Sequence, residues 1–325
     1  MKYFVGIDIG ATKSHALIAD ETGLAVGFGT AGPGNHEVVG YDGLIAVLND
    51  ITQQAEDCAG IARTDIAGAG FGVAGYDWPS ERKPTLEAIA TLGLICPIEA
   101  VNDTVIGLLA GVSDGWGIAV VGGTGENCWG WDRNRRVGRV TGNGGYLGEF
   151  GGSGWVVMRA VHAVSKAWSL RGPQTALSET FCKKTGAKDA SDLLEGLVLG
   201  RFGLDAGDAP LVFQTALVGD EVAKDVIRWA GEELANLAIG VIRQLAFEDQ
   251  EFEIVLIGSL FDGGSLILDP MKNAIWQVAS RAKFVRLQAP PVVGGVLLGM
   301  EMGGRNGYDV RERLVDTTTS LISNL

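Results

Sequence analysis

The feature that most constrains this chain is a short apolar strand running into a glycine and threonine turn, because the same unit occurs twice. Residues 5–13 read VGIDIGATK, and residues 118–125 read IAVVGGTG. In each turn, backbone N–H groups and a threonine hydroxyl are suited to surround phosphate oxygens. Two such turns predict a nucleotide held between two related domains.

The surroundings of each turn repeat as well. Apolar runs of strand length follow the first turn at residues 14–19 and 24–28, and others follow the second turn at residues 126–131 and 137–141. The order strand, turn, strand, turn, strand therefore occurs in both halves of the chain. The two copies lie too far apart for a solenoid repeat, so the pattern predicts a duplicated domain.

The composition describes a globular protein with large apolar cores. The chain has 325 residues, of which 46% are hydrophobic and 20% are charged, and this length predicts about two domains. The formal net charge of −13 argues against nucleic acid as a partner, because no basic patch offsets the repulsion of phosphates. An acidic chain that binds ATP must neutralise the triphosphate locally, and Mg²⁺ with one lysine does this.

The cysteines and the apolar segments indicate a soluble, cytoplasmic protein without a membrane partner. The four cysteines share no CxxC and no metal-ligand spacing, which favours isolated reduced thiols; they are Cys58, Cys96, Cys128 and Cys182. The first apolar run is interrupted at Asp8 and is too short for a signal peptide. No stretch approaches the roughly 18 apolar residues that a membrane-spanning helix needs.

Periodicity along the chain predicts strands that alternate with helices. The pattern predicts helices at residues 42–58, 86–92, 104–111, 155–170, 178–184, 192–199, 220–248 and 291–302, and strands at residues 66–73, 95–101 and 252–257. This alternation predicts a largely parallel sheet, in which ligands gather at the C-terminal ends of the strands. We place one domain at residues 1–115 and a second at residues 116–325, with the last helix a candidate to pack back on the first domain. The polar tail at residues 305–325 gives no indication of function.

The first turn carries groups suited to a metal ion and to phosphate. Asp8 lies at the end of the strand and is followed by Gly10, Thr12 and Lys13, in the pattern D-x-G-x-T-K. The Asp8 carboxylate suits hydrated Mg²⁺, Gly10 lets the backbone approach phosphate, and Lys13 supplies a cation. An ordinary hairpin turn is the alternative for this pattern taken alone.

Two further glycine turns supply the other candidate nucleotide contacts. Gly123, Thr124 and Gly125 form the second turn, in register with the first, and would contact the other phosphates across a cleft. A third turn, with Gly258 and Ser259, follows another predicted strand. A glycine hairpin and a plain strand-to-helix turn are the alternatives, but three such turns in this order favour a nucleotide site.

Asp103 is the candidate catalytic base. It follows a predicted strand and Asn102, and it precedes the helix predicted from Thr104. A carboxylate in this place can accept the proton of a substrate hydroxyl that attacks the γ-phosphate. The alternative is a helix N-cap, which aspartate also favours. The position of Asp103 between the two phosphate turns favours the base.

The three turns, in this order and spacing, resemble those of the actin-like ATPase and sugar kinase superfamily over nearly the whole chain. The resemblance implies an α/β fold of two duplicated ribonuclease H-like domains with a cleft between them. Within the superfamily, the sequence is similar to the BadF/BadG/BcrA/BcrD ATPase family, in the branch that holds eukaryotic-type N-acetylglucosamine kinase. Residues 125–128, GENC, resemble the G-S-N-C of that kinase.

The resemblance also implies roles for residues outside the turns. It implies that Asp103 is the catalytic aspartate, that Gly219 lies near the nucleotide, and that Gly258 and Ser259 contact the adenosine. It places the sugar on a set of polar side chains: Asn35, His36, Asn102, Asp103, Glu126, Asn127 and Glu149.

Two of these side chains depart from the family pattern. Residues 148–153 read GEFGGS where the family has G-D-E-G-S, so the sugar contact of the family aspartate is carried to Glu149. Glu126 replaces a small serine, and a carboxylate beside the 2-substituent of the sugar would favour a free amine over an acetamide.

These features predict an ATP- and Mg²⁺-dependent kinase that phosphorylates the 6-hydroxyl of N-acetylglucosamine or glucosamine. A kinase for another hexose is an alternative, because an acetamide, an amine or a hydroxyl at one carbon changes few contacts. A second alternative is the ATPase activator of a radical dehydratase, which the wide cysteine spacing disfavours because that activator holds a shared iron–sulfur cluster. A third is a sugar-responsive regulator without catalysis. The oligomeric state stays open, with a homodimer as one option.

Overall fold

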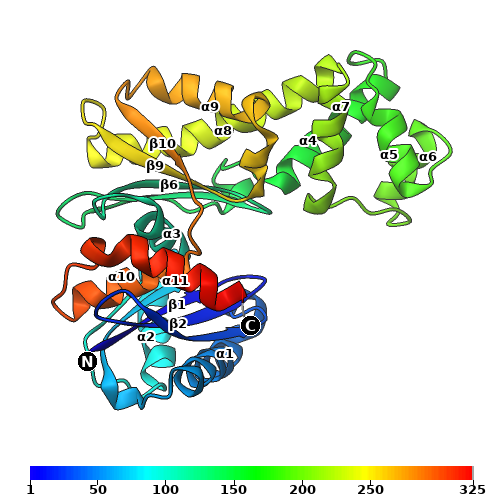
Figure 1. Ribbon diagram of the computed structural model, residues 1–325. Helices are drawn as coiled ribbons and strands as arrows, with labels where there is room; N and C mark the ends of the chain where they lie inside the picture. Colours follow the sequence, from blue (N-terminus) through cyan, green and yellow to red (C-terminus); the bar gives the residue numbers. More distant parts are fainter. Residues whose placement is uncertain (324–325) are drawn as a thin grey trace.

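The computed structural model describes residues 1–323 and shows two lobes, each built on a five-stranded sheet (Figure 1). The first sheet has the strand order β3-β2-β1-β4-β5. Its strands are β1 (Tyr3–Ile9), β2 (Ser14–Asp20), β3 (Ala25–Ala31), β4 (Ile66–Val73) and β5 (Ile98–Val101). β1, β2 and β3 are antiparallel neighbours, whereas β4 runs parallel to β1 and β5 runs parallel to β4.

The second sheet repeats this topology, with the strand order β10-β9-β6-β7-β8. Its strands are β6 (Gly117–Gly122), β7 (Glu126–Trp131), β8 (Val137–Val140), β9 (Phe252–Ile257) and β10 (Ala282–Arg286). Three antiparallel strands are again followed by two parallel ones. The structure confirms the α/β class and the duplication. It shows mixed sheets where we predicted largely parallel ones, because short turns such as residues 10–13 can join only antiparallel strands.

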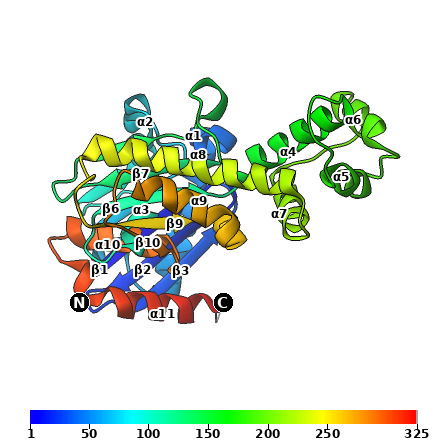
Figure 2. The ribbon, with the colours of Figure 1, turned by 90° about the horizontal axis from the view of Figure 1, so that it is seen from above.

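Among residues 1–323, eleven α-helices surround the two sheets. They are α1 (His36–Ala59), α2 (Arg82–Ala90), α3 (Asp103–Gly111), α4 (Ser153–Trp168), α5 (Leu177–Thr185), α6 (Ala190–Val198), α7 (Ala209–Leu217), α8 (Glu221–Leu245), α9 (Ser265–Trp276), α10 (Val292–Met302) and α11 (Arg311–Ser323). Figures 1 and 2 show α8 and α9 on the second lobe and α4 to α7 in an arm that extends from it. None of the helices in this part of the chain has both the length and the apolar character needed to cross a bilayer.

Helix α10 lies directly on the first sheet, although it comes from the end of the chain. It packs on β1 and β4, and α11 packs on β3. Glycines allow this close approach, because a Cβ on Gly6 would lie 2.2 Å from the backbone nitrogen of Val296. A Cβ on Gly70 would lie 2.3 Å from the carbonyl oxygen of Gly295. Helices α10 and α11, which follow residue 115, therefore complete the first lobe. The domain boundary at residue 115 remains a proposal.

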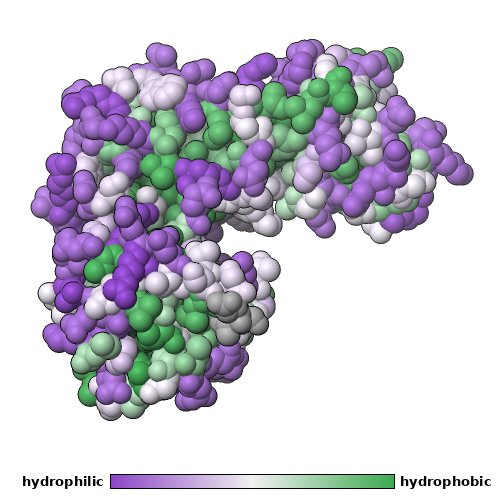
Figure 3. Space-filling view, viewed as in Figure 1, coloured by the Kyte–Doolittle hydropathy of each residue, from purple (hydrophilic) through white to green (hydrophobic). Residues whose placement is uncertain are grey.

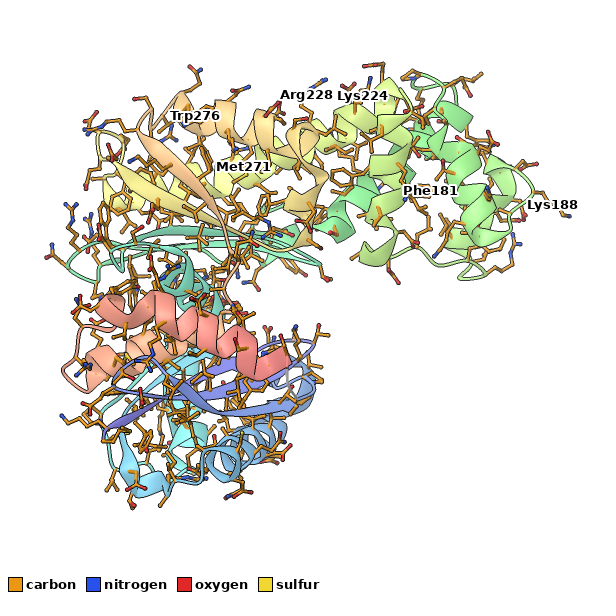
Figure 4. The ribbon with its side chains drawn as sticks, viewed as in Figure 1. Phe181, Lys188, Lys224, Arg228, Met271 and Trp276 are labelled. Carbon is orange, nitrogen blue, oxygen red and sulfur yellow. The ribbon has the colours of Figure 1, made fainter. Side chains whose placement is uncertain are left out.

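The arm and the second sheet share one hydrophobic core. Met271 on α9 and Phe181 on α5 are both fully buried and belong to the same cluster, and Figure 4 shows how far apart they lie. In the same view, Lys188 projects from the tip of the arm. The long helix α8 connects the two regions, and Asp220 caps its N-terminus by accepting a hydrogen bond from the N–H of Ala223 at 2.7 Å. The arm is therefore a packed extension of the second lobe.

Most predicted elements lie close to the observed ones. The strands predicted at residues 66–73 and 252–257 match β4 and β9. The helix predicted from residue 42 begins at His36, because a bend at Gly40, where φ is 70°, joins an additional turn to it. The sequence patterns missed α7, α9, β10 and α11. Two of these helices contain a proline, Pro210 in the first turn of α7 and Pro270 inside α9, and proline weakens the helical signal.

Helix α3 joins the two lobes. It packs against α10 of the first lobe and against β6 and β7 of the second. Its apolar side chains form one cluster with Val101, Trp129 and Val255, which come from both lobes. The space-filling view in Figure 3 shows the surface hollowed between the first lobe and the arm. The N-terminus of α3, with Asn102 and Asp103, thus lies at the junction of the lobes.

Candidate active site

Two carboxylates from the first lobe lie near each other. Asp8 is on β1 and Asp103 is in the first turn of α3, and both are half-buried. Burial, and then the charge of Asp103, raise the pKa of Asp8 to about 7, while Lys13 acts in the opposite direction. Burial also raises the pKa of Asp103 to about 6. Both groups therefore titrate near neutral pH, where a general base is useful.

The N-cap of α3 is Asn102 and not Asp103. The Oδ1 atom of Asn102 accepts a hydrogen bond from the N–H of Thr104 at 2.9 Å, as an N-cap does. Oδ1 of Asp103 accepts a hydrogen bond from the same N–H at 3.0 Å. Asn102 is thus the helix N-cap, which was the alternative role considered for Asp103.

Asp77, which the sequence analysis did not identify, completes the acidic side of this region. Oδ1 of Asp77 accepts a hydrogen bond from Nδ2 of Asn102 at 2.9 Å. Burial, and then the charges of Glu81, Asp103 and Glu37, raise the pKa of Asp77 to about 7. Asp77 follows β4, which lies between β1 and β5 in the sheet. The rule that polar residues after parallel strands gather at one edge of a sheet could have identified it.

Asn35 and His36 begin helix α1 on the same side of the first lobe. Asn35 is 6% exposed, and its Oδ1 accepts a hydrogen bond from the N–H of Glu37 at 2.9 Å, which makes it the N-cap of α1. A Cβ on Gly75 would lie 2.6 Å from this Oδ1, so the loop that leads to Asp77 passes beside Asn35. The His36 ring stacks on Tyr41 at 4.6 Å, and its Nδ1 is buried without a partner.

Asn127 links the second lobe to the carboxylates. It lies on β7, and its Oδ1 accepts a hydrogen bond from Oγ1 of Thr104 at 2.7 Å. Thr104 directly follows Asp103 on α3. The structure therefore brings together Asp8, Asn102, Asp103 and Asn127 from strands and helices that are far apart in sequence.

The two other predicted sugar-binding carboxylates hold loops of the second lobe. Oε2 of Glu126 accepts a hydrogen bond from the N–H of Gly152 at 3.0 Å, while its Oε1 is buried without a partner. Burial raises the pKa of Glu126 to about 7. Oε2 of Glu149 accepts from the N–H groups of Gly142 at 2.7 Å and Asn143 at 2.9 Å. Glu149 thus fixes the turn after β8.

The first glycine turn is open to solvent. The N–H of Gly10 donates to the carbonyl of Lys13 at 3.1 Å, and the carbonyl of Gly10 accepts from the N–H of Gly34 at 3.0 Å. Thr12 and Lys13 are both exposed. The hydroxyl of Thr12 and the ammonium group of Lys13 therefore lie on a hydrogen-bonded, solvent-exposed turn.

The second glycine turn is supported from two sides. The N–H of Ser153 at the start of α4 donates to the carbonyl of Gly123 at 2.9 Å. Gly258 has a φ of 108°, and a Cβ on it would lie 2.3 Å from the carbonyl oxygen of Gly122. Only glycine fits there, because a side chain would collide with the turn and would also strain the backbone. The third turn thus supports the second one directly.

A cavity of about 500 Å³ connects the second and third turns. Thr124, Ser153 and Ser259 supply hydroxyls to its wall, and Pro210 and Phe213 of α7 supply an apolar side. The sequence analysis missed this apolar side because it missed α7. Gly125 continues the turn beside Thr124 and is exposed.

Of the predicted nucleotide residues, Thr124 and Ser259 line this cavity, while Gly219 and the others do not. Gly219 lies between α7 and α8 with a φ of 105°, and nothing approaches within 4 Å of a Cβ built on it. The neighbouring Asp220 caps α8 and accepts a hydrogen bond from the N–H of Ala176 at 2.7 Å. These contacts give the Gly219 turn a structural role in the arm.

The donor groups fit ATP and Mg²⁺. The cavity has the size of a small-molecule site, and its lining combines hydroxyl groups with apolar side chains. Among residues 1–323, no cluster of three or more His, Cys, Asp and Glu side chains is arranged to hold a metal ion. Asp8 beside Asp103 suits Mg²⁺, which is usually held by one or two carboxylates together with substrate phosphates and water.

The cysteines do not contribute to this region. All four are free thiols: Cys58 is exposed, Cys96 and Cys182 are half-buried, and Cys128 is buried. Burial raises the pKa of the Cys128 thiol well above its ordinary value, so this thiol is inert.

Known proteins with similar sequences are sugar kinases. The chain is 25% identical over 304 residues to an N-acetylmuramic acid/N-acetylglucosamine kinase of Clostridium acetobutylicum, which covers 92% of this chain and 98% of that protein. It is 24% identical over 310 residues to an N-acetyl-D-glucosamine kinase of Dictyostelium discoideum, with 91% of this chain and 97% of that protein covered.

Solved structures show the same fold. A ROK family glucokinase from Streptomyces griseus, in complex with glucose and AMPPNP, superposes with a TM-score of 0.54 at 20% identity, over 92% of this chain and 99% of that one. The model of the BadF/BadG/BcrA/BcrD ATPase family matches residues 5–299, which include all three glycine turns. The chain therefore belongs to the BadF/BadG/BcrA/BcrD ATPase family.

Proposed function

We propose that this protein is an ATP-dependent amino-sugar kinase that phosphorylates the 6-hydroxyl of N-acetylglucosamine or glucosamine. The observation that carries the proposal is the position of Asp103, a half-buried carboxylate with a raised pKa beside Asp8 and at the junction of the lobes. The two kinases with similar sequences support an amino sugar as the acceptor.

Asp103 is the general base in this proposal. Its pKa of about 6 keeps it ionised at neutral pH, yet close enough to that pH to accept a proton from the sugar hydroxyl as the hydroxyl attacks phosphorus. The proton moves from the hydroxyl to a carboxylate oxygen of Asp103. Asn102, which caps α3, holds Asp103 in place from the preceding residue. The carboxylate is thus positioned by the helix and does not need to reorganise during the reaction.

The nucleotide lies along the two glycine turns. Thr124 and the backbone at Gly123 bind phosphate from the second lobe, and Gly10, Thr12 and Lys13 bind it from the first. The base and ribose occupy the cavity at Ser259, which follows Gly258, against the apolar residues of α7. Asp8 holds Mg²⁺, which when bound neutralises the charge of the phosphates.

The sugar lies between the lobes on side chains of both. Asn35, His36, Asn102 and Asp77 contact it from the first lobe, and Asn127, Glu126 and Glu149 contact it from the second. The Oε1 atom of Glu126, which is buried without a partner, is available to an ammonium group at the 2-position of the sugar. Closure of the lobes around the sugar would exclude water from the γ-phosphate and so suppress ATP hydrolysis.

A coupled ADP-release assay tests this function. The acceptors are glucosamine, N-acetylglucosamine, N-acetylmuramic acid and glucose, each with ATP and Mg²⁺, and ³¹P NMR of the product identifies the phosphorylated hydroxyl. We expect ADP release that depends on an amino sugar and a 6-phosphate product. ADP release that no sugar stimulates, together with stoichiometric iron in the purified protein, would contradict the kinase and support the dehydratase activator.

A further inference from the structure

A second cavity lies between the lobes, apart from the nucleotide cavity. Its volume is about 430 Å³, and its walls come from the loop after β4, the end of β5, strands β7 and β8, and α10. It shares no residue with the nucleotide cavity, and it reaches Asn102, the residue before Asp103. The proposed function assigns Asp77 and Asn102 of this lining to the acceptor sugar and uses none of the other lining residues.

Three tryptophans give this cavity broad apolar faces. Trp78 comes from the first lobe, and Trp129 and Trp131 come from β7 of the second lobe. Trp78 is 41% exposed, whereas the other two are almost fully buried. Indole rings pack well against the C–H faces of flat or ring-shaped ligands and bury much area at little entropic cost.

Polar groups on these walls have bonding capacity that the protein does not use. The guanidinium of Arg139 lies 5.6 Å from the ring centroids of both Trp78 and Trp129, and no carboxylate pairs with it within residues 1–323. The Nε1 atom of Trp129 is buried and lacks a partner. Arg82 and Glu99, also on the wall, form no ion pair in this part of the chain, and Glu99 accepts only from the N–H of Ala100.

We propose that this cavity is a second carbohydrate-binding site that takes one neutral saccharide ring. Sugar hydroxyls both donate and accept hydrogen bonds, so they match the unused donors of Arg82, Arg139 and Trp129 and the unused acceptor of Glu99. Apolar walls with a few placed polar groups are typical of small-molecule sites. Positive and negative side chains are balanced in number, because the wall carries three arginines and three carboxylates, of which Arg135 and Glu301 form an ion pair, and this balance favours a neutral ligand.

The position of the site couples it to the arrangement of the lobes. Arg139 and Trp129 belong to the second lobe and Trp78 to the first, so a bound ring contacts both lobes at once. A ligand that binds one arrangement of the lobes better than another shifts the population toward it. Two sources of the ring fit this chemistry: a separate sugar molecule, or a second ring attached to the sugar that is phosphorylated.

Calorimetric titration of the ATP-free protein tests the site. The probes are N-acetylglucosamine and its β-1,4-linked disaccharide, and the variants are Trp78→Ala and Arg139→Ala. Trp168→Ala, which removes a 56% exposed tryptophan from the end of α4, is the matched control. We expect both cavity variants to weaken the binding of at least one probe about tenfold or more, which is the effect of losing a direct contact worth about 1.4 kcal/mol. The control should bind both probes as the wild type does.

The pattern across the probes identifies the source of the ring. A separate sugar gives two binding events for the monosaccharide in the wild type and one in Trp78→Ala. An attached ring gives the disaccharide a higher affinity than the monosaccharide, and Trp78→Ala removes that advantage. Val137→Phe, which fills the cavity from a 47% exposed position on β8, should act as Trp78→Ala does. Circular dichroism melts establish that each variant is folded.

Unchanged binding of both probes in Trp78→Ala, Arg139→Ala and Val137→Phe would overturn the second site. Because binding is measured without ATP, this result is separate from the assay of kinase activity. Sugar-dependent ADP release with unchanged binding in these variants overturns the second site alone. Absent ADP release with binding that depends on Trp78 overturns the kinase alone.

Discussion

The two lobes repeat one topology but present different chemistry at corresponding positions. In the first lobe, Asp8 lies on β1 and Asp77 follows β4, so carboxylates gather at the ends of these strands. In the second lobe, the corresponding strands β6 and β9 are followed by Thr124 and Ser259, which supply hydroxyls on glycine turns. The strand order fixes where these side chains lie, and the residue type decides what they do.

The difference indicates a division of labour between the copies. Buried carboxylates with raised pKa values suit proton transfer and metal binding, whereas glycine backbone and hydroxyls suit phosphate and nucleoside. Both turns are held by backbone contacts, the first through Gly34 and the second through Ser153 and Gly258. In the proposed function, the nucleoside lies on the second lobe and the base on the first lobe, while both lobes contribute contacts to the phosphates and the sugar.

The largest expected effect is the loss of turnover in Asp103→Asn. An amide cannot accept the hydroxyl proton, so kcat should fall by about 10²–10⁴-fold, the range for a positioned general base. The fold should be retained, because Asn102 and not Asp103 caps α3. Asp42→Asn, at an exposed position on α1, is the control and should turn over normally. A kcat near that of the wild type in Asp103→Asn would show that Asp103 is not the general base.

Gly258→Ala should damage the second lobe in a different way. The new Cβ would lie 2.3 Å from the carbonyl oxygen of Gly122, so the nucleotide turn must shift. Such strain is worth about 1–3 kcal/mol and should raise the Kd of an ATP analogue by about 10- to 100-fold. Gly219→Ala is a matched control, because its φ of 105° is close to the 108° of Gly258 while its surroundings are open. Equal effects of the two variants would show that the contact with Gly122 is unimportant.

Glu126→Gln should change the preference between sugars. The amide oxygen can still accept from the N–H of Gly152, so the variant removes the charge and keeps the loop. If the carboxylate pairs with the amine of glucosamine, the ratio of kcat/KM for N-acetylglucosamine over glucosamine should rise about tenfold, since a hydrogen bond to a charged group is worth about 1.5–3 kcal/mol. An unchanged ratio would limit Glu126 to holding Gly152.

The smallest expected effect is on stability. The pKa of Asp8 is about 7 in the folded protein against an ordinary value of 3.8, so the folded state holds a proton that the unfolded chain loses between these pH values. The contribution of Asp8 to the free energy of unfolding is therefore fully present below about pH 4 and is lost as the pH rises through about 7. Without Mg²⁺, Asp8→Asn should melt about 2–4 °C higher than the wild type at pH 8 if the difference is about 1 kcal/mol.

The same comparison at pH 4 is the control for this prediction. Asp8 is protonated in the folded wild type at that pH, so the two proteins should melt at similar temperatures. A melting difference that does not depend on pH would assign the effect to packing and not to the charge of Asp8.

The sequence predicted the parts of this molecule that local patterns determine. The three glycine turns and the strands β4 and β9 follow from short-range signals in the residues themselves. Asp77 was missed because its role depends on Asn102, which follows the next strand of the sheet. The apolar side of the candidate nucleotide cavity was missed because Pro210 weakened the helical pattern of α7.

The hydrogen-bond partners of the charged side chains could not be predicted from the sequence either. A resemblance predicted that Glu126 and Glu149 contact the sugar, but it could not show that they also accept from the backbone N–H groups of Gly152 and Gly142. Such contacts join loops that are brought together only by the tertiary fold. Sequence patterns suggested candidate residues for the chemistry, and the structure was needed to show which contacts hold them.

Titration of two variants with two ligands tests the division of labour most directly. The variants are Asp103→Asn and Gly258→Ala, and the ligands are a non-hydrolysable ATP analogue with Mg²⁺ and the preferred amino sugar, measured by calorimetry. We predict that Gly258→Ala weakens the ATP analogue about tenfold or more and leaves the sugar affinity within about twofold. Asp103→Asn should leave the affinity for the ATP analogue unchanged. Equal weakening of the ATP analogue in both variants would contradict the proposed placement of the nucleoside on the second lobe and of the base on the first.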